Sequence, residues 1–291
     1  MSRGFRGNPM KQVLKSKFTG SLDRTYLRWK SWTHQNRGRF VPKLLIDFSV
    51  GEYRVRTVSN ISDLQRVLRL RYEVFIREGL NKNRALKLDL DAYDFLADHL
   101  VVENRETGEI LGTYRIISSL FSDRFYSENE FELGDLLRRP GHKLELGRAC
   151  IRPQYRTGAI IALLWRGVKQ YMDATQTRYM FGCASIKTMS LEKISLIYHY
   201  LMEKGHFSSE FRIVPTEEFR IRSLGNGPAF ALSDSAELRS LIPSLLRSYF
   251  KAGAVVVGEP ALDSEFQCID FLTILDTQKL EGSYEKRFSK A

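Results

Sequence analysis

The order of predicted strands and helices in this 291-residue sequence indicates an α/β fold with a mixed, twisted sheet and flanking helices. Three observations support it. Residues 52–58 alternate polar and apolar side chains as a strand does, and residues 62–79 carry apolar residues at helical spacing. Residues 144–151 then form a strand that enters an apolar helix over 159–174. We expect one continuous domain from residue 46 to residue 291.

The remaining elements follow from the same periodicities. Ser62 or Asp63 begins the first helix as its N-cap, and Gly79 ends it. Residues 99–118 read as an antiparallel pair around the turn "RETGE". The other predicted elements are a central strand at 178–185, helices at 191–205 and 236–252, and strands at 254–259 and 268–275.

The positive charge is concentrated in the first 40 residues. The whole chain carries a net charge of +11, and residues 1–40 contain ten Lys and Arg against one Asp, which leaves +2 for the rest. Apolar residues recur among these charges at three- or four-residue spacing. Residues 1–45 therefore resemble a basic amphipathic arm that binds an anionic membrane surface or an acidic protein. A solvated tail is the alternative, and no nucleic-acid partner is expected because no recognition motif follows.

The three cysteines and the apolar runs indicate the compartment. Cys150, Cys183 and Cys268 are isolated in apolar segments without metal-ligand spacing, so we expect buried free thiols and no metal site. No apolar run approaches the roughly 18–20 residues of a membrane span. We expect a cytoplasmic protein that associates peripherally with the inner face of the cytoplasmic membrane.

The turn "RPQYRTG" at residues 152–158 joins a strand to a helix, an arrangement that commonly binds phosphate. Arg152 and Arg156 supply positive charge, and Tyr155 lies between them. Its one glycine, Gly158, limits how closely the backbone can approach a large phosphate group.

The sequence resembles two branches of the GNAT acyltransferases. The motifs are "RLRYEVFIREG", "DLDAYDFLADHLVV", "GTYRII" and "LELGRACIRPQYR", followed by a tail that contains "VVVGEPALDSEFQCIDFLTIL". The first four are shared by acyl-homoserine-lactone synthases and by the ornithine N-acyltransferases of ornithine-lipid synthesis, also labelled hemolysin-like. The tail is similar to the second branch only. Together the motifs cover about residues 55–280.

The resemblance implies that the strands at 144–151 and 178–185 splay apart and admit a pantetheine thioester. A neutral amine attacks the thioester carbonyl and a carboxylate takes the proton, so no metal or further cofactor is required. The coenzyme A loop of these enzymes resembles [Q/R]-x-x-G-x-[G/A], and this chain has Ala159 where a glycine falls. That difference favours the acyl-phosphopantetheine of acyl carrier protein as donor.

The resemblance also suggests catalytic residues. Glu145 on the first splayed strand is the expected general base, or alternatively a structural partner of Arg115 or Arg148. Alternation places Glu145 and Arg148 on opposite faces unless a bulge intervenes. The acidic stretch before the strand at residue 99 offers Asp94 as the preferred acceptor ligand and His99 as an alternative base. Turn and cap roles for these aspartates are equally consistent with the sequence.

The remaining candidates bind substrate or organise the site. Arg148 is expected in an ion pair that organises the site, because a guanidinium suits a fixed carboxylate. Arg71 and Phe75 on the first helix line the acyl entrance or belong to the core. The tail acids have no sharper expected role than loop anchoring, and they are Glu259, Asp263, Glu265 and Asp270.

These expectations combine into one function. The resemblance implies that the chain transfers a 3-hydroxyacyl or other long fatty acyl group from acyl carrier protein to the α-amine of ornithine or a similar amino acid, giving a lyso-ornithine-lipid precursor. One alternative is a signal synthase that acylates S-adenosylmethionine and forms a lactone. The other is a non-catalytic protein that binds acyl carriers or membranes.

Overall fold

The structure is a computed structural model that describes residues 40–222, 224 and 236–280. Residues 1–39 of the predicted basic arm lie outside this part. The described end of that arm packs on the domain, because Phe40 is buried and the amides of Lys43 and Leu44 donate hydrogen bonds to Asp98. Within the described ranges, no helix has the length and apolar content of a membrane span.

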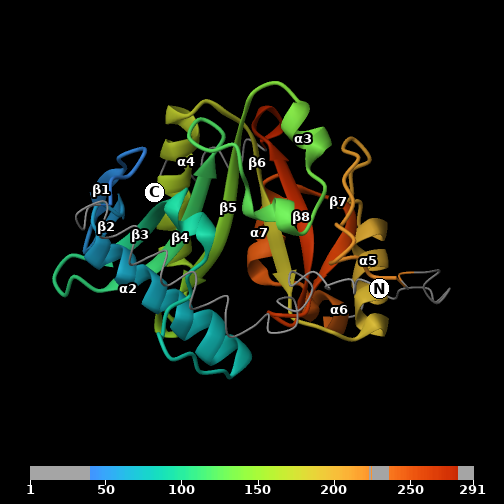
Figure 1. Cartoon of the computed structure of the whole chain (residues 1–291), viewed down its shortest axis with the longest axis horizontal. Coiled ribbons are helices and arrows are strands. Elements are labelled where there is room, and N and C mark those ends of the chain that lie inside the picture. The colour runs from blue at the N-terminus through green and yellow to red at the C-terminus, as the bar shows by residue number, and fades with distance from the viewer. Residues whose placement is uncertain (1–39, 223, 225–235, 281–291) are drawn as a thin grey trace, which may run out of the picture.

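A single mixed sheet of eight strands forms the centre of the molecule, in the order β1-β2-β3-β4-β5-β6-β8-β7 (Figure 1). The strands are β1 (Asp47–Val50), β2 (Tyr53–Thr57), β3 (Asp98–Asn104), β4 (Ile110–Ser118), β5 (His142–Ile151), β6 (Thr177–Ile186), β7 (Val255–Asp263) and β8 (Cys268–Asp276). Only β5 and β6 are parallel neighbours. The pattern confirms the predicted fold class and the predicted antiparallel pair.

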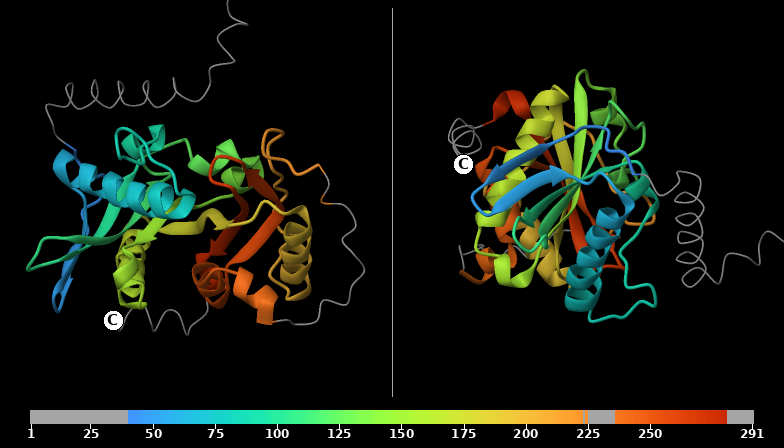
Figure 2. Two further views of the ribbon diagram at one scale, coloured as in Figure 1. Left: turned by 90° about the horizontal axis from the view of Figure 1, so that it is seen from below. Right: turned by 90° about the vertical axis from the view of Figure 1, so that its left-hand side faces the viewer.

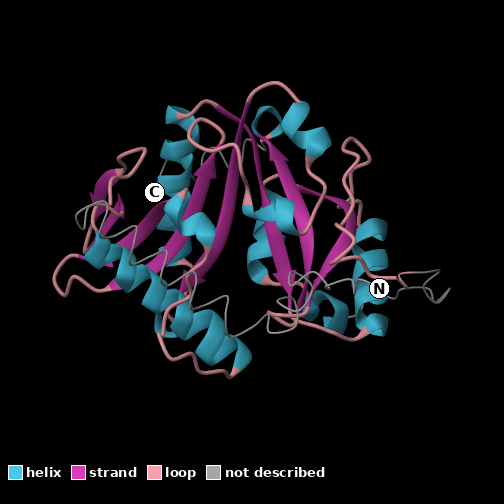
Figure 3. Cartoon of the chain, viewed as in Figure 1, coloured by secondary structure: helices cyan, strands magenta, loops and turns pink. Residues whose placement is uncertain are grey.

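Helices cover both faces of the sheet, as Figures 2 and 3 show. The helices are α2 (Ile61–Arg71), α3 (Gly134–Arg138), α4 (Ala159–Ala174), α5 (Leu191–Glu203), α6 (Ala236–Leu241) and α7 (Ser244–Lys251). α2 continues as a π-helical segment over Tyr72–Glu78. One face carries α2, this segment and α3, and the other carries α4 to α7.

Two predicted helices differ from the observed ones at their ends. Asn60 caps α2, in place of the predicted Ser62 or Asp63, because its side-chain oxygen accepts a hydrogen bond from the amide of Asp63. The helix expected over 236–252 is interrupted before Pro243, which cannot donate a backbone hydrogen bond to the preceding turn. The strand β1 was not predicted and forms a hairpin with β2.

The sheet separates into two halves between β5 and β6. Their parallel pairing runs from His142 opposite Thr177 to Glu145 opposite Phe181 and stops there. Beyond that point β5 stays paired with β4, and β6 stays paired with β8. The two strands diverge toward the bottom of Figure 1. A Cβ on Gly182 would overlap the carbonyl oxygen of Leu146, so glycine is required where the strands part.

Candidate active site

A cavity of about 340 Å³ lies where β5 and β6 diverge. Its walls come from the π-helical segment, the loop at 126–130, the two diverging strands, α7 and the β7–β8 connection. Phe75, Leu80 and Leu246 make one part of the wall apolar. The structure therefore places Phe75 at the cavity, as one of the two sequence interpretations expected.

A β-bulge in β5 turns Arg148 into this cavity. Arg148 and Ala149 together face Tyr114 on β4, because the pairing shifts between Thr113 and Arg115. The backbone of Arg148 is left-handed, with φ of 51°, which breaks the strand alternation. Arg148 and Glu145 consequently both line the cavity. The expectation that they lie on opposite faces applied only without a bulge.

Three arginines and three aspartates form a continuous ion cluster beside the cavity. We define the ion cluster by its members, which are Arg71, Arg115, Arg148, Asp89, Asp91 and Asp94. Every arginine contacts two of the aspartates within 3.3 Å. The predicted ion pairing of Arg148 is thus confirmed, and its partners are the aspartates before β3.

The centre of the ion cluster is removed from water, whereas Arg148 and Asp91 at its edge are 15% and 25% exposed. The Arg71 side chain has 0% exposure and lies 2.8 Å from Asp89 and 2.6 Å from Asp94. Burial alone raises the pKa of a carboxyl group, but Arg71 and Arg148 outweigh it at Asp89, whose pKa is lowered. Arg71 is enclosed and does not line the cavity, so the structure does not place it at the acyl entrance.

Asp94 and His99 also lie behind the cavity wall. Asp94 is fully buried and pairs with Arg71. Its carboxylate also accepts a hydrogen bond from the amide of Asp91, the N-cap residue of the short turn at Ala92–Phe95. His99 is fully buried, and burial followed by the charge of Arg71 lowers the pKa of its ring well below the usual value. Neither residue lines the cavity, so the structure does not place either at the acceptor site.

Glu145 lines the cavity and holds the neighbouring loop in place. Its carboxylate accepts hydrogen bonds from the amide of Tyr126 at 2.7 Å and from the amide and hydroxyl of Ser127 at 2.7 and 2.5 Å. Burial raises its pKa, although the bonds from Ser127 act in the opposite direction. Its observed partners are thus backbone and hydroxyl groups of this loop, where the alternative interpretation expected Arg115 or Arg148. Its role as base stays a prediction.

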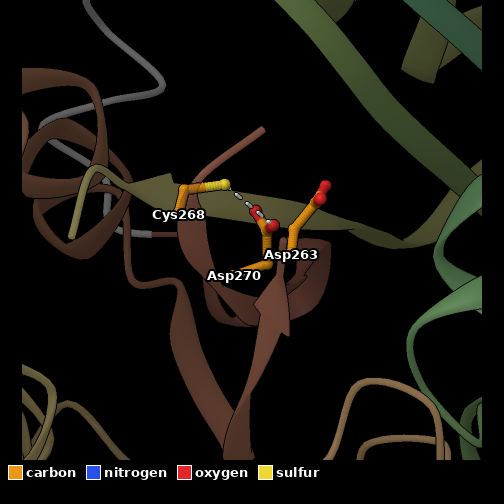
Figure 4. Close-up of side chains that lie close together, drawn as sticks. All are labelled: Asp263, Cys268 and Asp270. Carbon is orange, nitrogen blue, oxygen red and sulfur yellow. Dashed lines mark hydrogen bonds between the residues drawn. The ribbon is translucent and has the colours of Figure 1, made fainter. Parts of the chain in front are cut away.

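A second set of carboxylates faces the cavity from the loop at 126–130 and from β7 and β8. We call Glu130, Asp263 and Asp270 the acidic triad. Asp270 accepts a hydrogen bond from the Ser185 hydroxyl at 2.5 Å. It accepts another from the Cys268 thiol at 3.5 Å, which Figure 4 shows. Asp263 accepts two backbone amide bonds within its own turn, at 2.8 and 2.9 Å.

Positive charge does not compensate the acidic triad. Within residues 40–222, 224 and 236–280, no Lys, Arg or His forms an ion pair with its members, and Glu130 Oε2 is buried without a hydrogen-bond partner. Burial, together with Asp270 and Asp263, raises the pKa of Glu130 to about 9. Burial also raises the pKa of Asp270, to about 6. The triad is therefore a group of desolvated acids inside the cavity whose ionised forms lack a counter-charge from the described residues.

The sequence resemblance pointed to Asp263 and Asp270 but suggested no chemical role for them beyond loop anchoring. It did not point to Glu130. The sequence around Glu130 carries no motif that separates it from its acidic neighbours. Ligand atoms of Asp263, Cys268 and Asp270 lie within 4.8 Å of one another, a spacing that a metal ion could use. Burial raises the pKa of the Cys268 thiol, which keeps that group protonated and disfavours thiolate ligation.

The predicted phosphate turn lies at the surface before α4. Arg152 pairs with Glu109 at 2.9 Å, and Arg156 pairs with Glu78 at 2.6 Å. Gly158 begins the helix with φ of 101°, a conformation that favours glycine. Tyr155 packs partly on the core. Since 43% of the Arg156 side chain is exposed, its ion pair is open to exchange with a bound anion.

This chain is similar to known proteins in both sequence and structure. Residues 70–166 match a family model described as an acetyltransferase (GNAT) domain. A solved CoA-dependent acyl-homoserine lactone synthase aligns with 78% of this chain and 82% of its own, at 15% identity and a TM-score of 0.43.

Two curated relatives are more similar in sequence. An L-ornithine N(alpha)-acyltransferase of Rhizobium meliloti is 30% identical over 249 residues, which are 81% of this chain and 83% of the relative. An enzyme with the same name from Agrobacterium fabrum is 30% identical over 266 residues, with 81% and 84% covered. With this similarity over most of both chains and a GNAT domain, the protein is an acyltransferase that belongs to the L-ornithine N(alpha)-acyltransferase family.

Proposed function

We propose that this protein transfers a (3-hydroxy)fatty acyl group from acyl carrier protein to the α-amine of ornithine, giving a lyso-ornithine-lipid precursor. The main supporting observation is the cavity between the diverging strands β5 and β6. Its wall is apolar at Phe75, Leu80 and Leu246 and charged at Arg148 and the acidic triad. An acyl thioester and a charged amino acid therefore both find complementary surfaces there.

The acceptor's carboxylate is the proposed ligand of Arg148. Its guanidinium lines the cavity, where Nε lies 3.3 Å from Asp89 and Nη2 lies 3.3 Å from Asp91. The aromatic ring of Tyr126 supports it at 4.7 Å from the ring centre, and Phe266 does so at 5.0 Å. A planar guanidinium supported by two aromatic rings at a cavity wall suits recognition of a carboxylate.

The proposed chemistry is direct aminolysis. The neutral α-amine attacks the thioester carbonyl, an amide C–N bond forms and the C–S bond breaks. One amine proton passes to a carboxylate, and the leaving thiolate takes up a proton. Glu145 is the proposed carboxylate that takes up this proton. A carboxylate offers about four lone-pair positions, and hydrogen bonds from the loop occupy three of them. Its burial and raised pKa favour proton uptake.

The donor's phosphodiester is proposed to bind at the turn before α4. Arg152, Tyr155 and Arg156 lie there, together with the free amides of a helix start. Both arginines are held by exposed carboxylates, Glu109 and Glu78, which a phosphate can displace at low cost.

Mass spectrometry of a reconstituted reaction tests the proposal. Purified protein is incubated with ornithine and either acyl–acyl carrier protein or the matching acyl–coenzyme A. We expect N-acyl-ornithine to form faster from the carrier protein. If free fatty acid is the sole product, the proposal that the protein acylates ornithine is overturned. An acylated S-adenosylmethionine product would instead identify a signal synthase.

The basic segment at residues 1–40 is proposed to hold the enzyme at an anionic membrane surface. Its ten Lys and Arg and one Asp supply the charge for such binding. Sedimentation with phosphatidylglycerol vesicles, compared between the full chain and a chain lacking residues 1–40, measures the effect. Equal sedimentation of the two would remove this role.

A further inference from the structure

We infer that the acidic triad of Glu130, Asp263 and Asp270 binds the side-chain ammonium of the amino-acid acceptor and so selects a diamino acid. This inference deepens the proposed function and rests on it. The triad, Arg148 and the diverging strands line the same cavity, so one acceptor molecule can contact all of them.

The triad combines three buried carboxyl groups that have no cationic partner among the described residues. Its three carboxylates are at most 6% exposed. No cationic side chain of the described residues forms an ion pair with them, whereas the buried Asp63, Asp89 and Asp94 each pair with an arginine. Buried carboxylates without a counter-charge are unfavourable unless a ligand supplies one.

The hydrogen bonds inside the triad orient it toward the cavity. The Ser185 hydroxyl fixes one oxygen of Asp270, and two backbone amides fix one oxygen of Asp263. Glu130 Oε2 remains buried without a partner. A primary ammonium has three N–H donors, so carboxylates that converge from three directions are a suitable receptor.

Arg148 belongs to the ion cluster and also lines the cavity that the triad lines. It contacts the rings of Tyr126 and Phe266, and Phe266 belongs to the turn whose amides bind Asp263. The cavity thus has a positive group on the β5 side and a negative group on the β7–β8 side. An α-carboxylate on Arg148 and a terminal ammonium on the triad would fix both ends of the acceptor.

An organic ammonium explains the triad better than a metal ion does. Cys268 donates its thiol hydrogen to Asp270 and keeps it because burial raises the thiol pKa. One oxygen of Asp270 already accepts a hydrogen bond from Ser185, and one oxygen of Asp263 accepts two from the turn at 265–266. Metal binding remains the competing explanation, and the experiment below distinguishes it from ammonium binding.

Calorimetric titration of the full chain with ornithine and with norvaline tests the inference. Norvaline has the same carbon skeleton and lacks the terminal amine. We expect ornithine to bind about 10- to 100-fold more tightly, the range of a lost charge-assisted hydrogen bond.

Asp270→Asn should remove most of that preference, and Asp263→Asn provides a second variant if the first fails to fold. Glu259→Gln is the matched control, since Glu259 is exposed on the same strand as Asp263 and should leave the preference unchanged.

The outcomes separate the two proposals. Equal affinity for ornithine and norvaline overturns the triad inference, even where both are acylated and the proposed function stands. Tighter binding of ornithine without N-acyl-ornithine in the mass-spectrometric reaction supports the triad and overturns the proposed function. Loss of ornithine binding after chelator treatment, with recovery on adding a divalent cation, overturns the inference in favour of a metal site.

Discussion

The ion cluster and the acidic triad are two groups of buried acids with opposite surroundings. In the ion cluster, Asp89, Asp91 and Asp94 face three arginines at distances of 3.3 Å or less. In the triad, the carboxylates have hydroxyl, thiol and amide partners and no cationic side chain among the described residues. Burial raises the pKa of Glu130 and Asp270, whereas arginines hold the pKa of Asp89 below its usual value.

The difference separates structural charge from functional charge. A charged group leaves water at a cost of several kcal/mol, and close pairing recovers most of it. The ion cluster is balanced within the chain, so it stabilises the loop before β3 and positions Arg148. The triad is not balanced, which is the arrangement expected of a site whose counter-charge comes with the ligand.

Removing one cation from the ion cluster should have the largest effect. Arg71→Met leaves Asp89 and Asp94 short of a partner at full burial, and we expect the free energy of unfolding to fall by about 3–5 kcal/mol. Urea denaturation measures it. Arg54→Met is the control, because its pair with Asp47 is exposed and should contribute at most about 1 kcal/mol. Similar losses in the two variants would remove the distinction between buried and surface pairs.

Neutralising a triad member should raise the free energy of unfolding, whereas the Arg71 variant should lower it. The pKa of Glu130 is raised from 4.5 to about 9, so the folded protein binds this proton while the unfolded chain releases it. Stability linked to Glu130 is therefore complete below about pH 4.5 and is lost as the pH rises toward about 9. Glu130→Gln should stabilise the protein by roughly 1–3 kcal/mol at pH 7 and flatten this dependence.

Urea denaturation at pH 5, 7 and 8.5 measures the effect of Glu130→Gln, and Glu128→Gln is the nearby control. Glu128 caps its own turn through the amide of Phe125 and does not line the cavity. A destabilised Glu130→Gln protein at pH 7 would contradict the view that the triad is uncompensated without ligand.

Glu145 is a third case, a buried carboxylate held by neutral donors. Glu145→Gln places an amide NH₂ group opposite the N–H groups of Tyr126 or Ser127, and we expect a loss of roughly 1–2 kcal/mol. If Glu145 also accepts the proton, turnover should fall more than the affinity for the carrier. The pH profile of kcat separates the two roles, because a purely structural residue would leave its shape unchanged.

The sequence predicted the parts of this comparison that depend on local pattern. The strand at β5 and the helix α4 were evident from a change in hydrophobic periodicity within residues 144–174. Asp89, Asp91 and Asp94 were recognised as a cluster because they are close in sequence. Their partners were not, since Arg71, Arg115 and Arg148 come from α2, β4 and β5.

The acidic triad could not be assembled from the sequence. Glu130 meets Asp263 and Asp270 only through the order of the sheet, which places β8 beside β6. The bulge at Arg148 was equally hidden, because an arginine with φ of 51° has no local sequence signal. A strict alternation therefore placed Arg148 on the wrong side of the strand, away from the cavity that it lines.

The surface pair of Arg156 with Glu78 should show the smallest effect on stability. Both side chains are more than 40% exposed, at 43% and 44%, so Arg156→Ala should change the free energy of unfolding by at most about 0.5 kcal/mol. The same change should raise KM for acyl–acyl carrier protein several-fold and leave KM for ornithine unchanged, because the turn lies outside the acceptor cavity. Steady-state kinetics with each substrate varied in turn measures both values.

Arg105→Ala is the control for a general charge effect, because Arg105 is an exposed arginine on the β3–β4 turn. An equal rise in carrier KM in both variants would mean that overall positive charge attracts the carrier, and that the turn before α4 is not its phosphate site.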